Sequence, residues 1–217
     1  MKKGVKITLI ILFVIIILSS AGFFYIFTQG FAWFGSQGRY DSSVLNDMGV
    51  IYESQSDING WAEGFSNTDN CPWGFVHEGL DYFYNNNSAV LAAAPGKIID
   101  IQYRDNGDYV ENRYWVRIDT LFNRTVEVSY NFESWTNKTA DWENQQRMIS
   151  VQKGDWVEKG QEIGRFLKIG DGAHIHFGVK ERKNTYCPQK YLSTTAYNEL
   201  LSLVHFYHPI WDLCYVE

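Results

Sequence analysis

The chain carries an uncharged run of 21 residues near its start, from Ile7 to Phe27. At about 1.5 Å per helical residue, such a run spans the roughly 30 Å hydrocarbon core of a bilayer. Lys2, Lys3 and Lys6 precede the run and no basic residue follows it closely, which indicates a cytoplasmic N-terminus. The sequence therefore predicts cytoplasmic residues 1–6, a single transmembrane anchor over residues 7–27 and an extracytoplasmic C-terminal domain.

A cleaved signal peptide is the alternative, because Ser19-Ser20-Ala21 is an acceptable small-residue cleavage site after a short apolar stretch. The apolar and aromatic residues 22–34 beyond that site favour the uncleaved anchor. In both interpretations the C-terminal domain is exported from the cytoplasm. Without the three N-terminal lysines, 16 of the 19 basic residues remain against 25 acidic ones, a formal charge of −9. This acidity argues against a nucleic-acid partner, whose phosphates require a basic face.

Short β segments separated by turns dominate residues 71–190. The expected strands are Ala89–Ala94, Lys97–Tyr103, Tyr114–Ile118, Val126–Phe132, Gln161–Phe166 and His174–Val179. Their number and the scarcity of helix-length periodicity predict an all-β, mostly antiparallel domain. In residues 191–217, apolar residues four apart between Tyr191 and Val204 predict one C-terminal helix. Residues 28–70, rich in Gly, Ser, Asn and Asp, are interpreted as a stalk and approach segment.

The polar stretch from Glu133 to Ser150 contains Trp135 and Trp142. It is interpreted as an exposed loop with two anchoring aromatic residues, and a substrate-binding rim is the alternative.

Three cysteines, Cys71, Cys187 and Cys214, lie in a compartment that permits disulfides, and the sequence leaves every pairing open. We favour a Cys187–Cys214 bridge that ties down the C-terminal tail.

Three of the five histidines fall in two short patterns, His77-Glu-Gly-Leu-Asp81 and His174-Ile-His176. Residues i and i+2 of a strand face the same side, so His174 and His176 point into one space. A catalytic zinc ion takes three protein ligands and keeps one open position. His77, Asp81 and one histidine of the pair supply two nitrogens and one oxygen. The remaining histidine lies beside the metal, where an imidazole can take or hold a proton.

Each pattern alone has a simpler explanation, because H-x-x-x-D occurs in surface turns and H-x-H occurs as a polar pair on strands. Together they resemble a known family. The segment VHEGLDYFYNNNSAVLAAAPGKIIDI is similar to the first zinc motif, H-x-G-x-D, of the lysostaphin-like metallopeptidases, peptidase family M23. The segments VQKGDWVEKGQEIGRF and GAHIHFGV resemble the glycine-punctuated hairpin and the H-x-H strand of that family.

The resemblance covers roughly residues 73–179 and implies a barrel-like, mostly antiparallel β fold with a groove on one face of the sheet. By position, it implies that His77, Asp81 and His176 bind one Zn²⁺ and that His174 is a catalytic histidine. Cell-envelope peptides of the peptidoglycan type, either glycine-containing cross-bridges or stem peptides, are the implied substrate class. No protein partner is indicated.

One family position differs. The family carries a further histidine in a Y-x-H-L segment, and here Asn131 takes its place in the sequence Ser129-Tyr130-Asn131-Phe132. Asparagine can donate a hydrogen bond to an oxyanion but cannot titrate. His205 and His208 could replace the histidine, although an ordinary aromatic-rich tail explains them more simply.

Three functions therefore remain open. The first is a zinc endopeptidase, and the second is a zinc-stabilised, non-catalytic homologue that binds envelope peptides or regulates a hydrolase. The third is a carrier or phosphotransfer domain, because K-G-D-W-V-E-K-G-Q is also similar to hairpins of lipoyl and sugar-phosphotransferase carriers. The carrier is disfavoured because its chemistry belongs in the cytoplasm and no lysine occupies a lipoyl-type turn.

Overall fold

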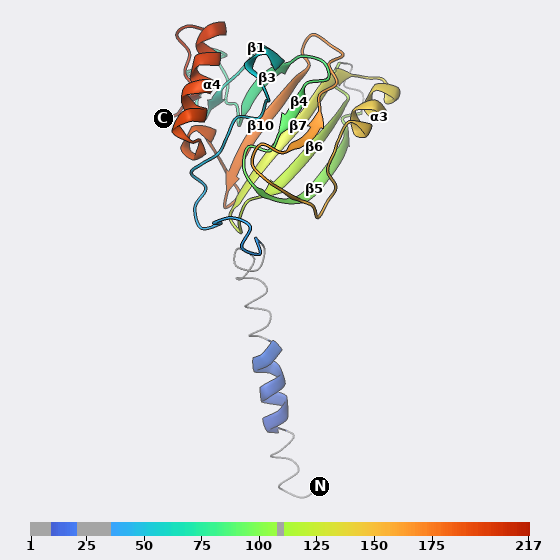
Figure 1. Ribbon diagram of the computed structural model, residues 1–217, viewed down its shortest axis with the longest axis vertical. Coiled ribbons are helices and arrows are strands. Elements are labelled where there is room, and N and C mark those ends of the chain that lie inside the picture. Colours follow the sequence, from blue (N-terminus) through green and yellow to red (C-terminus); the bar gives the residue numbers. More distant parts are fainter. Residues whose placement is uncertain (1–9, 21–35, 108–110) are drawn as a thin grey trace, which may run out of the picture. The chain divides into compact units, whose positions relative to one another are not determined.

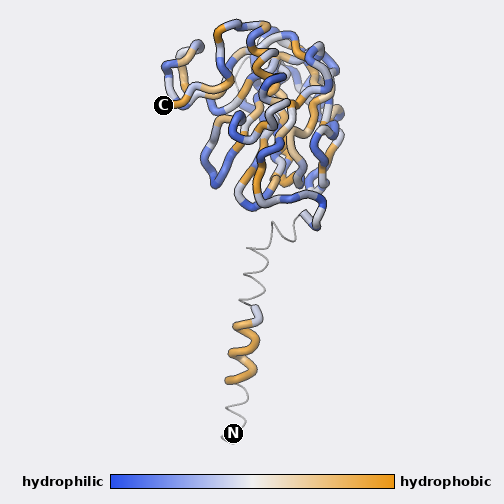
Figure 2. The backbone as a smooth tube through the Cα atoms, turned by 60° about the vertical axis from the view of Figure 1, so that its left-hand side comes forward, coloured by the Kyte–Doolittle hydropathy of each residue, from blue (hydrophilic) through white to orange (hydrophobic). Residues whose placement is uncertain are grey.

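The computed structural model describes residues 10–20, 36–107 and 111–217 of the chain (Figure 1). It divides into two compact units, Met1–Ser43 and Val44–Glu217. In the first unit, residues 10–20 form a helix, and the tube of Figure 2 is orange over its apolar residues, 10–18. Within the described residues, no helix is both long and apolar enough to span a bilayer. The expected anchor over residues 7–27 lies partly outside this range, so the anchor and the exported location stay predictions.

The second unit is built around one large antiparallel sheet. Its strands are β1 (Ile58–Trp61), β3 (Leu80–Tyr84), β5 (Gly96–Asp105), β6 (Tyr114–Leu121), β7 (Val126–Thr136), β8 (Trp156–Val157), β10 (His174–Glu181) and β11 (Asn184–Tyr186). They follow the order β1-β3-β10-β7-β6-β5-β8, and β11 pairs with β10. The strands run side by side in Figure 1, with β10 and β7 near the middle.

Two short strand pairs and four helices complete the described part of this unit. The pairs are β4 (Ala89–Leu91) with β9 (Glu162–Arg165), and β2 (Phe65–Ser66) with β12 (Cys214–Tyr215). The helices are η1 (Gln55–Asp57), α3 (Thr139–Arg147), η2 (Pro188–Tyr191) and α4 (Thr194–Tyr207). Helix α4 contacts β1, an edge strand, and α3 contacts the inner strands β6 and β7, so the two α-helices lie on opposite sides in Figure 1.

The two faces of the sheet differ in chemistry because successive side chains of a strand point to opposite sides. The apolar face is buried and is formed on β3, β7 and β10 by Tyr82, Tyr84, Tyr130, Phe132, Ile175 and Phe177. The backbone N–H of Ala93, just after β4, donates to the hydroxyl of Tyr130 and joins the β4 segment to this face. The opposite face of the same strands carries Asp81, Asn131, Glu133, His174 and His176.

The six expected strands are all present, with ends that differ by a few residues, and α4 confirms the expected C-terminal helix. The β1 and β2 strands had not been expected, and they lie within residues 44–70, which belong to the compact unit.

The interpretation of Glu133–Ser150 as an exposed loop is wrong. Strand β7 continues to Thr136, and α3 occupies Thr139–Arg147. Helix α3 has little apolar periodicity because its buried anchor is polar. The side chain of Gln145 donates to the carbonyl of Arg165 and accepts from the N–H of Leu167 and the hydroxyl of Ser134.

A disulfide between Cys187 and Cys214 confirms the favoured pairing, and Cys71 is free. The bridge joins residues 27 apart in sequence, with Cα atoms 6.0 Å apart. In the chain-entropy model, a disulfide that closes a loop of this length stabilises the folded chain by about 3 to 4 kcal/mol. The bridge therefore ties β12 to the segment between β11 and η2.

Candidate metal centre

His77, Asp81 and His176 lie together on the polar face of the sheet. The Nε2 atom of His77 is 3.1 Å from Nδ1 of His176 and 3.3 Å from Oδ2 of Asp81. The Nδ1 atom of His176 is 2.8 Å from Oδ1 of Asp81. All three ligand atoms lie within 4.8 Å of one another, and the residues are buried or half-buried. The structure thus brings together the three residues that the sequence proposed as metal ligands.

Backbone pairing explains this convergence. Asp81 lies on β3 and His176 on β10, and the two residues are direct partners in the antiparallel register. His77 precedes β3 and forms an isolated bridge with Ser66 of β2, which turns the chain back toward the sheet. The carbonyl oxygen of Gly64 accepts a hydrogen bond from Nδ1 of His77 at 2.8 Å. Because a carbonyl can only accept, this contact orients Nε2 of His77 toward Asp81 and His176.

Gly79, within the first motif, leaves space for the ring of His176 from the second motif. A Cβ atom at Gly79 would lie 2.5 Å from the Cε1 and Nε2 atoms of His176 and 2.7 Å from the carbonyl oxygen of Phe177. These contacts are too close for any side chain. The glycine of H-x-G-x-D is therefore required by the packing of the His176 ring against the backbone of the preceding turn.

The donor set fits zinc. Two imidazole nitrogens and one carboxylate oxygen are ordinary zinc ligands, and bonds of 2.0–2.2 Å in a tetrahedral site place ligand atoms about 3.3 Å apart. The separations of 2.8, 3.1 and 3.3 Å come close to this spacing. The hydrogen bond from His77 to Gly64 is also typical, since zinc-bound histidines usually donate their second N–H to a carbonyl or carboxylate.

The cluster has a strong electrostatic preference for a cation. Burial alone would lower the pKa of His77, but hydrogen bonding to Asp81 and Gly64 raises that pKa to about 9. Burial opposes ionisation of Asp81 as well, yet hydrogen bonds from His176 and His77 hold the pKa of Asp81 well below its ordinary value. Glu63 lies beside Asp81, and burial together with the Asp81 charge raises the pKa of Glu63. These interactions favour a positive charge next to the carboxylate of Asp81.

His174 lies next to this cluster, on the same face of β10. Its Nδ1 donates to the carbonyl of Gly172 at 2.7 Å, so Nε2 faces Oδ2 of Asp81 at 3.5 Å and Oε2 of Glu133 at 3.7 Å. Burial alone would lower the pKa of His174, but Asp81, Glu133 and the Gly172 carbonyl raise it. The structure places His174 beside the three candidate ligands, where it can hold a proton close to them.

Asn131 lies directly opposite His176 in the register of β7 and β10. It is 8% exposed, and its Oδ1 atom has no hydrogen-bond partner among the described residues. Glu133, two residues later on the same face, pairs with His174 and accepts a hydrogen bond from Nδ2 of Asn112 at 2.5 Å. The polar face therefore presents an amide beside one histidine and a carboxylate beside the other.

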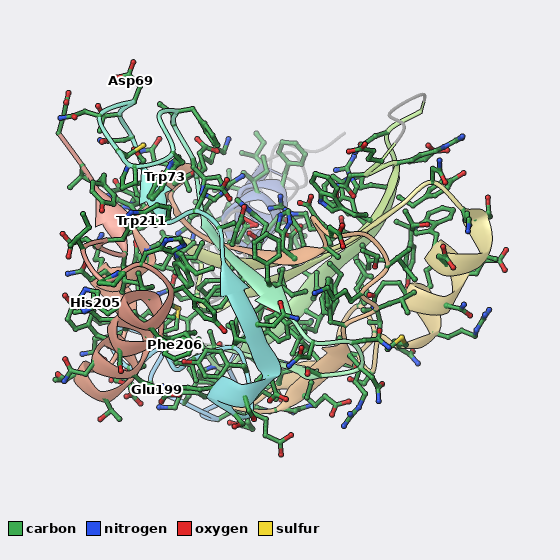
Figure 3. All side chains as sticks on the ribbon, turned by 90° about the horizontal axis from the view of Figure 1, so that it is seen from above. Asp69, Trp73, Glu199, His205, Phe206 and Trp211 are labelled. Atoms are coloured by element: carbon green, nitrogen blue, oxygen red, sulfur yellow. A yellow bond between two sulfur atoms is a disulfide. The ribbon has the colours of Figure 1, made fainter. Side chains whose placement is uncertain are left out.

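The two C-terminal histidines lie away from the cluster. His208 Nε2 contacts the carbonyl of Trp61 at 2.9 Å, and its ring stacks on Trp211 with centroids 3.7 Å apart. His205 lies on α4, where its side chain is exposed (Figure 3). The simpler interpretation, an aromatic-rich tail, agrees with these contacts, and neither histidine takes the position of the missing family histidine.

Three neighbours of the cluster were not singled out from the sequence, namely Glu63, Gly64 and Glu133. Glu63 and Gly64 lie in the segment interpreted as an approach to the fold, and β1 and β2 bring them to the site. For Glu133 a signal was present, because it follows Asn131 at the i+2 spacing that places both side chains on one strand face.

The model of peptidase family M23 matches residues 75–188 of this sequence. The match covers more than half of the chain and contains all of the cluster described above. The chain belongs to peptidase family M23, the lysostaphin-like peptidases. No curated protein sequence matches it significantly.

Among solved structures, Csd3 of Helicobacter pylori is similar over 71% of this chain and 38% of its own, with 21% identity and a TM-score of 0.46. A zinc-containing peptidase of Vibrio cholerae is 20% identical over 65% of this chain and 39% of its own, with a TM-score of 0.43. The catalytic domain of lysostaphin from Staphylococcus simulans is 19% identical over 62% of this chain and 91% of its own, with a TM-score of 0.39. This chain thus spans well under half of the first two proteins.

Proposed function

We propose that the chain is a zinc-dependent metalloendopeptidase that hydrolyses peptide bonds in a cell-envelope polymer of the peptidoglycan type. The observation that carries this proposal is the convergence of His77 Nε2, Asp81 Oδ2 and His176 Nδ1 at separations that suit one zinc ion. Membership of peptidase family M23 supports the reaction class. The polymer and the exported location of the domain are parts of the proposal.

The residues of the site have separate roles in the proposed hydrolysis. His77, Asp81 and His176 would hold the ion, which supplies Lewis-acid polarisation of the substrate carbonyl and activation of water. His174, with Nδ1 held by the Gly172 carbonyl, directs Nε2 toward the cluster and moves a proton between the attacking water and the leaving amine. Asn131, opposite His176, donates an amide hydrogen bond to the developing oxyanion.

Hydrolysis by the full chain tests this proposal. The zinc-loaded chain should cleave peptides released from isolated cell-envelope polymer, and a zinc chelator should abolish cleavage. His174→Ala should keep the metal and lose about a hundredfold or more in rate. His205→Ala, an exposed histidine on α4, is the matched control and should retain full activity. A zinc-loaded chain that is inert on all such peptides would contradict the proposal.

The alternative is a zinc-stabilised homologue that binds envelope peptides or regulates a hydrolase without cleaving bonds. Asn131 favours it, because a buried amide stands where the family carries a titratable histidine. Under this alternative the chain binds zinc and envelope peptides, and neither the wild type nor Asn131→His cleaves them. The intact His174, held by Gly172 beside the cluster, favours the enzyme.

A further inference from the structure

Three exposed cations lie together at the end of the sheet where β10 turns into β11. Arg182 and Lys183 form the turn between these two strands, and within the described part of the chain neither forms a salt bridge. The backbone N–H of Arg182 donates to the carbonyl of Thr125 at 2.8 Å, which joins this turn to the turn before β7. That second turn carries the exposed Arg124. We refer to Arg124, Arg182 and Lys183 as the basic turns.

The backbone of the β10–β11 turn is unfavourable for the residues that occupy it. The φ angle is 51° at Arg182 and 74° at Lys183. Two consecutive positive φ angles are typical of a type I′ hairpin turn, in which Asn-Gly is the preferred pair because long side chains avoid this region. Such strain is concentrated at positions that have a function. The turn therefore keeps two cations where other residues would fold more easily.

The carboxylates next to the basic turns have cations of their own. Glu181 accepts from Nζ of Lys190 at 2.6 Å and from the hydroxyl of Tyr191 at 3.0 Å. Glu127 lies directly opposite Lys180 in the register of β7 and β10. The three cations of the basic turns therefore add a net positive charge at this end of the sheet.

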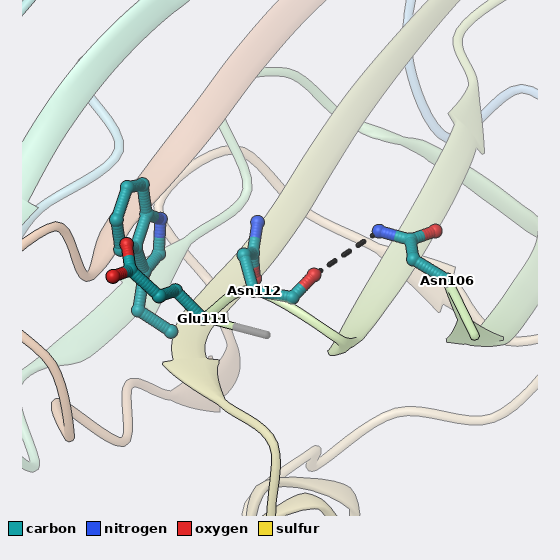
Figure 4. A pocket seen from close by; sticks show the side chains of 4 residues that line it. Asn106, Glu111 and Asn112 are labelled. Atoms are coloured by element: carbon teal, nitrogen blue, oxygen red, sulfur yellow. Dashed lines mark hydrogen bonds between the residues drawn. The ribbon is translucent and has the colours of Figure 1, made fainter. Parts of the chain in front are cut away.

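This positive end contrasts with the rest of the molecule. The chain beyond Lys6 has a formal charge of −9. At the other end of β7, a hollow of about 590 Å³ is lined by one carboxylate and no cation (Figure 4). Its lining residues are Asn106, Glu111, Asn112 and Trp135. An anionic surface would therefore repel most of the molecule and attract the basic turns.

The chain enters the second compact unit close to the basic turns. This unit begins at Val44, and four residues later the N–H of Met48 donates to the carbonyl of Tyr191 at 2.9 Å. The hydroxyl of Tyr191 donates to Glu181, the residue before Arg182. Residues 28–43 connect Val44 to the predicted anchor and span at most about 55 Å when fully extended. An anchor in a bilayer would therefore keep the basic turns within reach of the lipid.

We propose that the basic turns form a docking surface that binds the headgroups of anionic phospholipids. The inference goes beyond the proposed function and rests on the predicted anchor. Guanidinium and ammonium groups donate charge-assisted hydrogen bonds to the phosphate oxygens of such lipids. At about 3.3 Å per residue, β10 carries His174 roughly 20 Å away from the turn at its other end. Docking would thus hold the candidate metal centre away from the lipid, where an envelope polymer can reach it.

The acylation rate of Lys183 in the full chain tests the docking surface without zinc or substrate. The chain is reconstituted in vesicles of phosphatidylcholine and in vesicles that also contain phosphatidylglycerol, and a succinimidyl ester then labels its lysines. Mass spectrometry gives the rate at Lys183 relative to Lys138, an exposed lysine beyond the other end of β7. This ratio should fall about fivefold in the anionic vesicles and recover in about 1 M salt. Equal ratios in the two kinds of vesicle, or a chain that floats with neither, would overturn the proposal.

Variants and a competing anion complete the test. Arg124→Gln combined with Arg182→Gln should reduce the protection of Lys183 to less than about twofold. Arg104→Gln combined with Arg147→Gln removes two exposed arginines from β5 and α3 and should preserve the protection. Protection that survives the first pair of substitutions would overturn the proposal. So would protection by soluble polyphosphate in phosphatidylcholine vesicles without protection by anionic vesicles, because a polymer would then be the ligand. A chain that docks but does not cleave would support the docking surface and contradict the enzyme.

Discussion

The carbonyl oxygen of Gly64 accepts a hydrogen bond from Nδ1 of His77, and this contact links the metal centre to the C-terminal end of the chain. Gly64 immediately precedes β2, whose Phe65 pairs with Cys214 of β12. Cys214 is in turn bridged to Cys187. The disulfide therefore supports the strand that orients a candidate zinc ligand.

Replacing both bridged cysteines by serine should destabilise the fold and loosen the metal centre. The free energy of unfolding should fall by about 3 to 4 kcal/mol, because the reduced chain regains loop entropy. Zinc affinity should fall about tenfold, as expected when the support of a ligand is lost. Denaturant unfolding and a zinc titration measure the two effects. Cys71→Ser changes a free cysteine and should alter neither, and a double variant with wild-type zinc affinity would contradict the proposed link.

Gly79→Ala should disrupt the metal centre while leaving the sheet intact. The added methyl group would lie 2.5 Å from the His176 ring and 2.7 Å from a backbone oxygen, so the ring must move. We expect zinc affinity to fall by about a hundredfold or more, with little change in the far-ultraviolet circular dichroism spectrum. Gly49→Ala is the control, since its Cβ would make only ordinary contacts at 3.6 Å. Equal zinc affinities for the two variants would show that the His176 ring can shift without weakening zinc binding, which would contradict the requirement for glycine at this position.

Zinc affinity should rise with pH up to about 9. In the metal-free chain the pKa of His77 is raised to about 9, so the ion must displace a proton from that histidine at neutral pH. Affinity should therefore increase by up to about tenfold per pH unit between pH 6.5 and 9 and level off above. Chelator-competition titrations at several pH values measure this slope, and an affinity independent of pH would contradict it.

Stability of the metal-free chain should change in the opposite direction. The pKa of His77 is raised in the folded state above its ordinary value of 6.5. The protonated ring therefore stabilises the fold fully below about pH 6.5, and this stabilisation is lost as the pH rises through about 9. His77→Gln should flatten this part of the stability profile in denaturant unfolding. If the pH dependence of the unfolding free energy is the same in the variant, a group other than His77 titrates in this pH range.

Asn131→His separates the enzyme from the non-catalytic alternative. A histidine opposite His176 restores a titratable group on the face of the cluster, and hydrolysis by an active chain should accelerate by about tenfold or more. Asn131→Ala removes the amide donor and should slow hydrolysis by about a hundredfold. Steady-state rates on a single envelope peptide measure both. Wild-type rates in both variants would remove Asn131 from the mechanism.

Gln145→Leu should detach α3 from the sheet. The substitution leaves the N–H of Leu167, the carbonyl of Arg165 and the hydroxyl of Ser134 without their partner. Each buried polar group left unpaired costs about 1 to 3 kcal/mol, so the free energy of unfolding should fall by several kcal/mol. Gln146→Leu, on the next residue of α3, should have a much smaller effect in the same unfolding experiment. Similar losses for both variants would contradict the role of Gln145.

The central sheet and the candidate metal centre were predictable because their signals are local. An H-x-H pair on an apolar strand and an aspartate four residues after a histidine can be read from residues 77–81 and 174–176 alone. The antiparallel pairing of β3 with β10 then brings Asp81 and His176 together, as the resemblance implied.

Other elements could not be predicted because tertiary contacts specify them. Helix α3 has no apolar stripe, and its anchor Gln145 is recognisable only once its partners on the β9 segment are in place. Strand β2 is two residues long and exists because β12 and His77 pair with it. Glu63 and Gly64 reach the site by that route, which the composition of residues 28–70 does not reveal.

The zinc content of the purified full chain tests the central claim most directly. The wild type should hold one zinc ion per chain by elemental analysis, His77→Ala should hold almost none, and His205→Ala should match the wild type. A wild-type chain without zinc, or a His77→Ala chain that retains one equivalent, would contradict the metal centre proposed here.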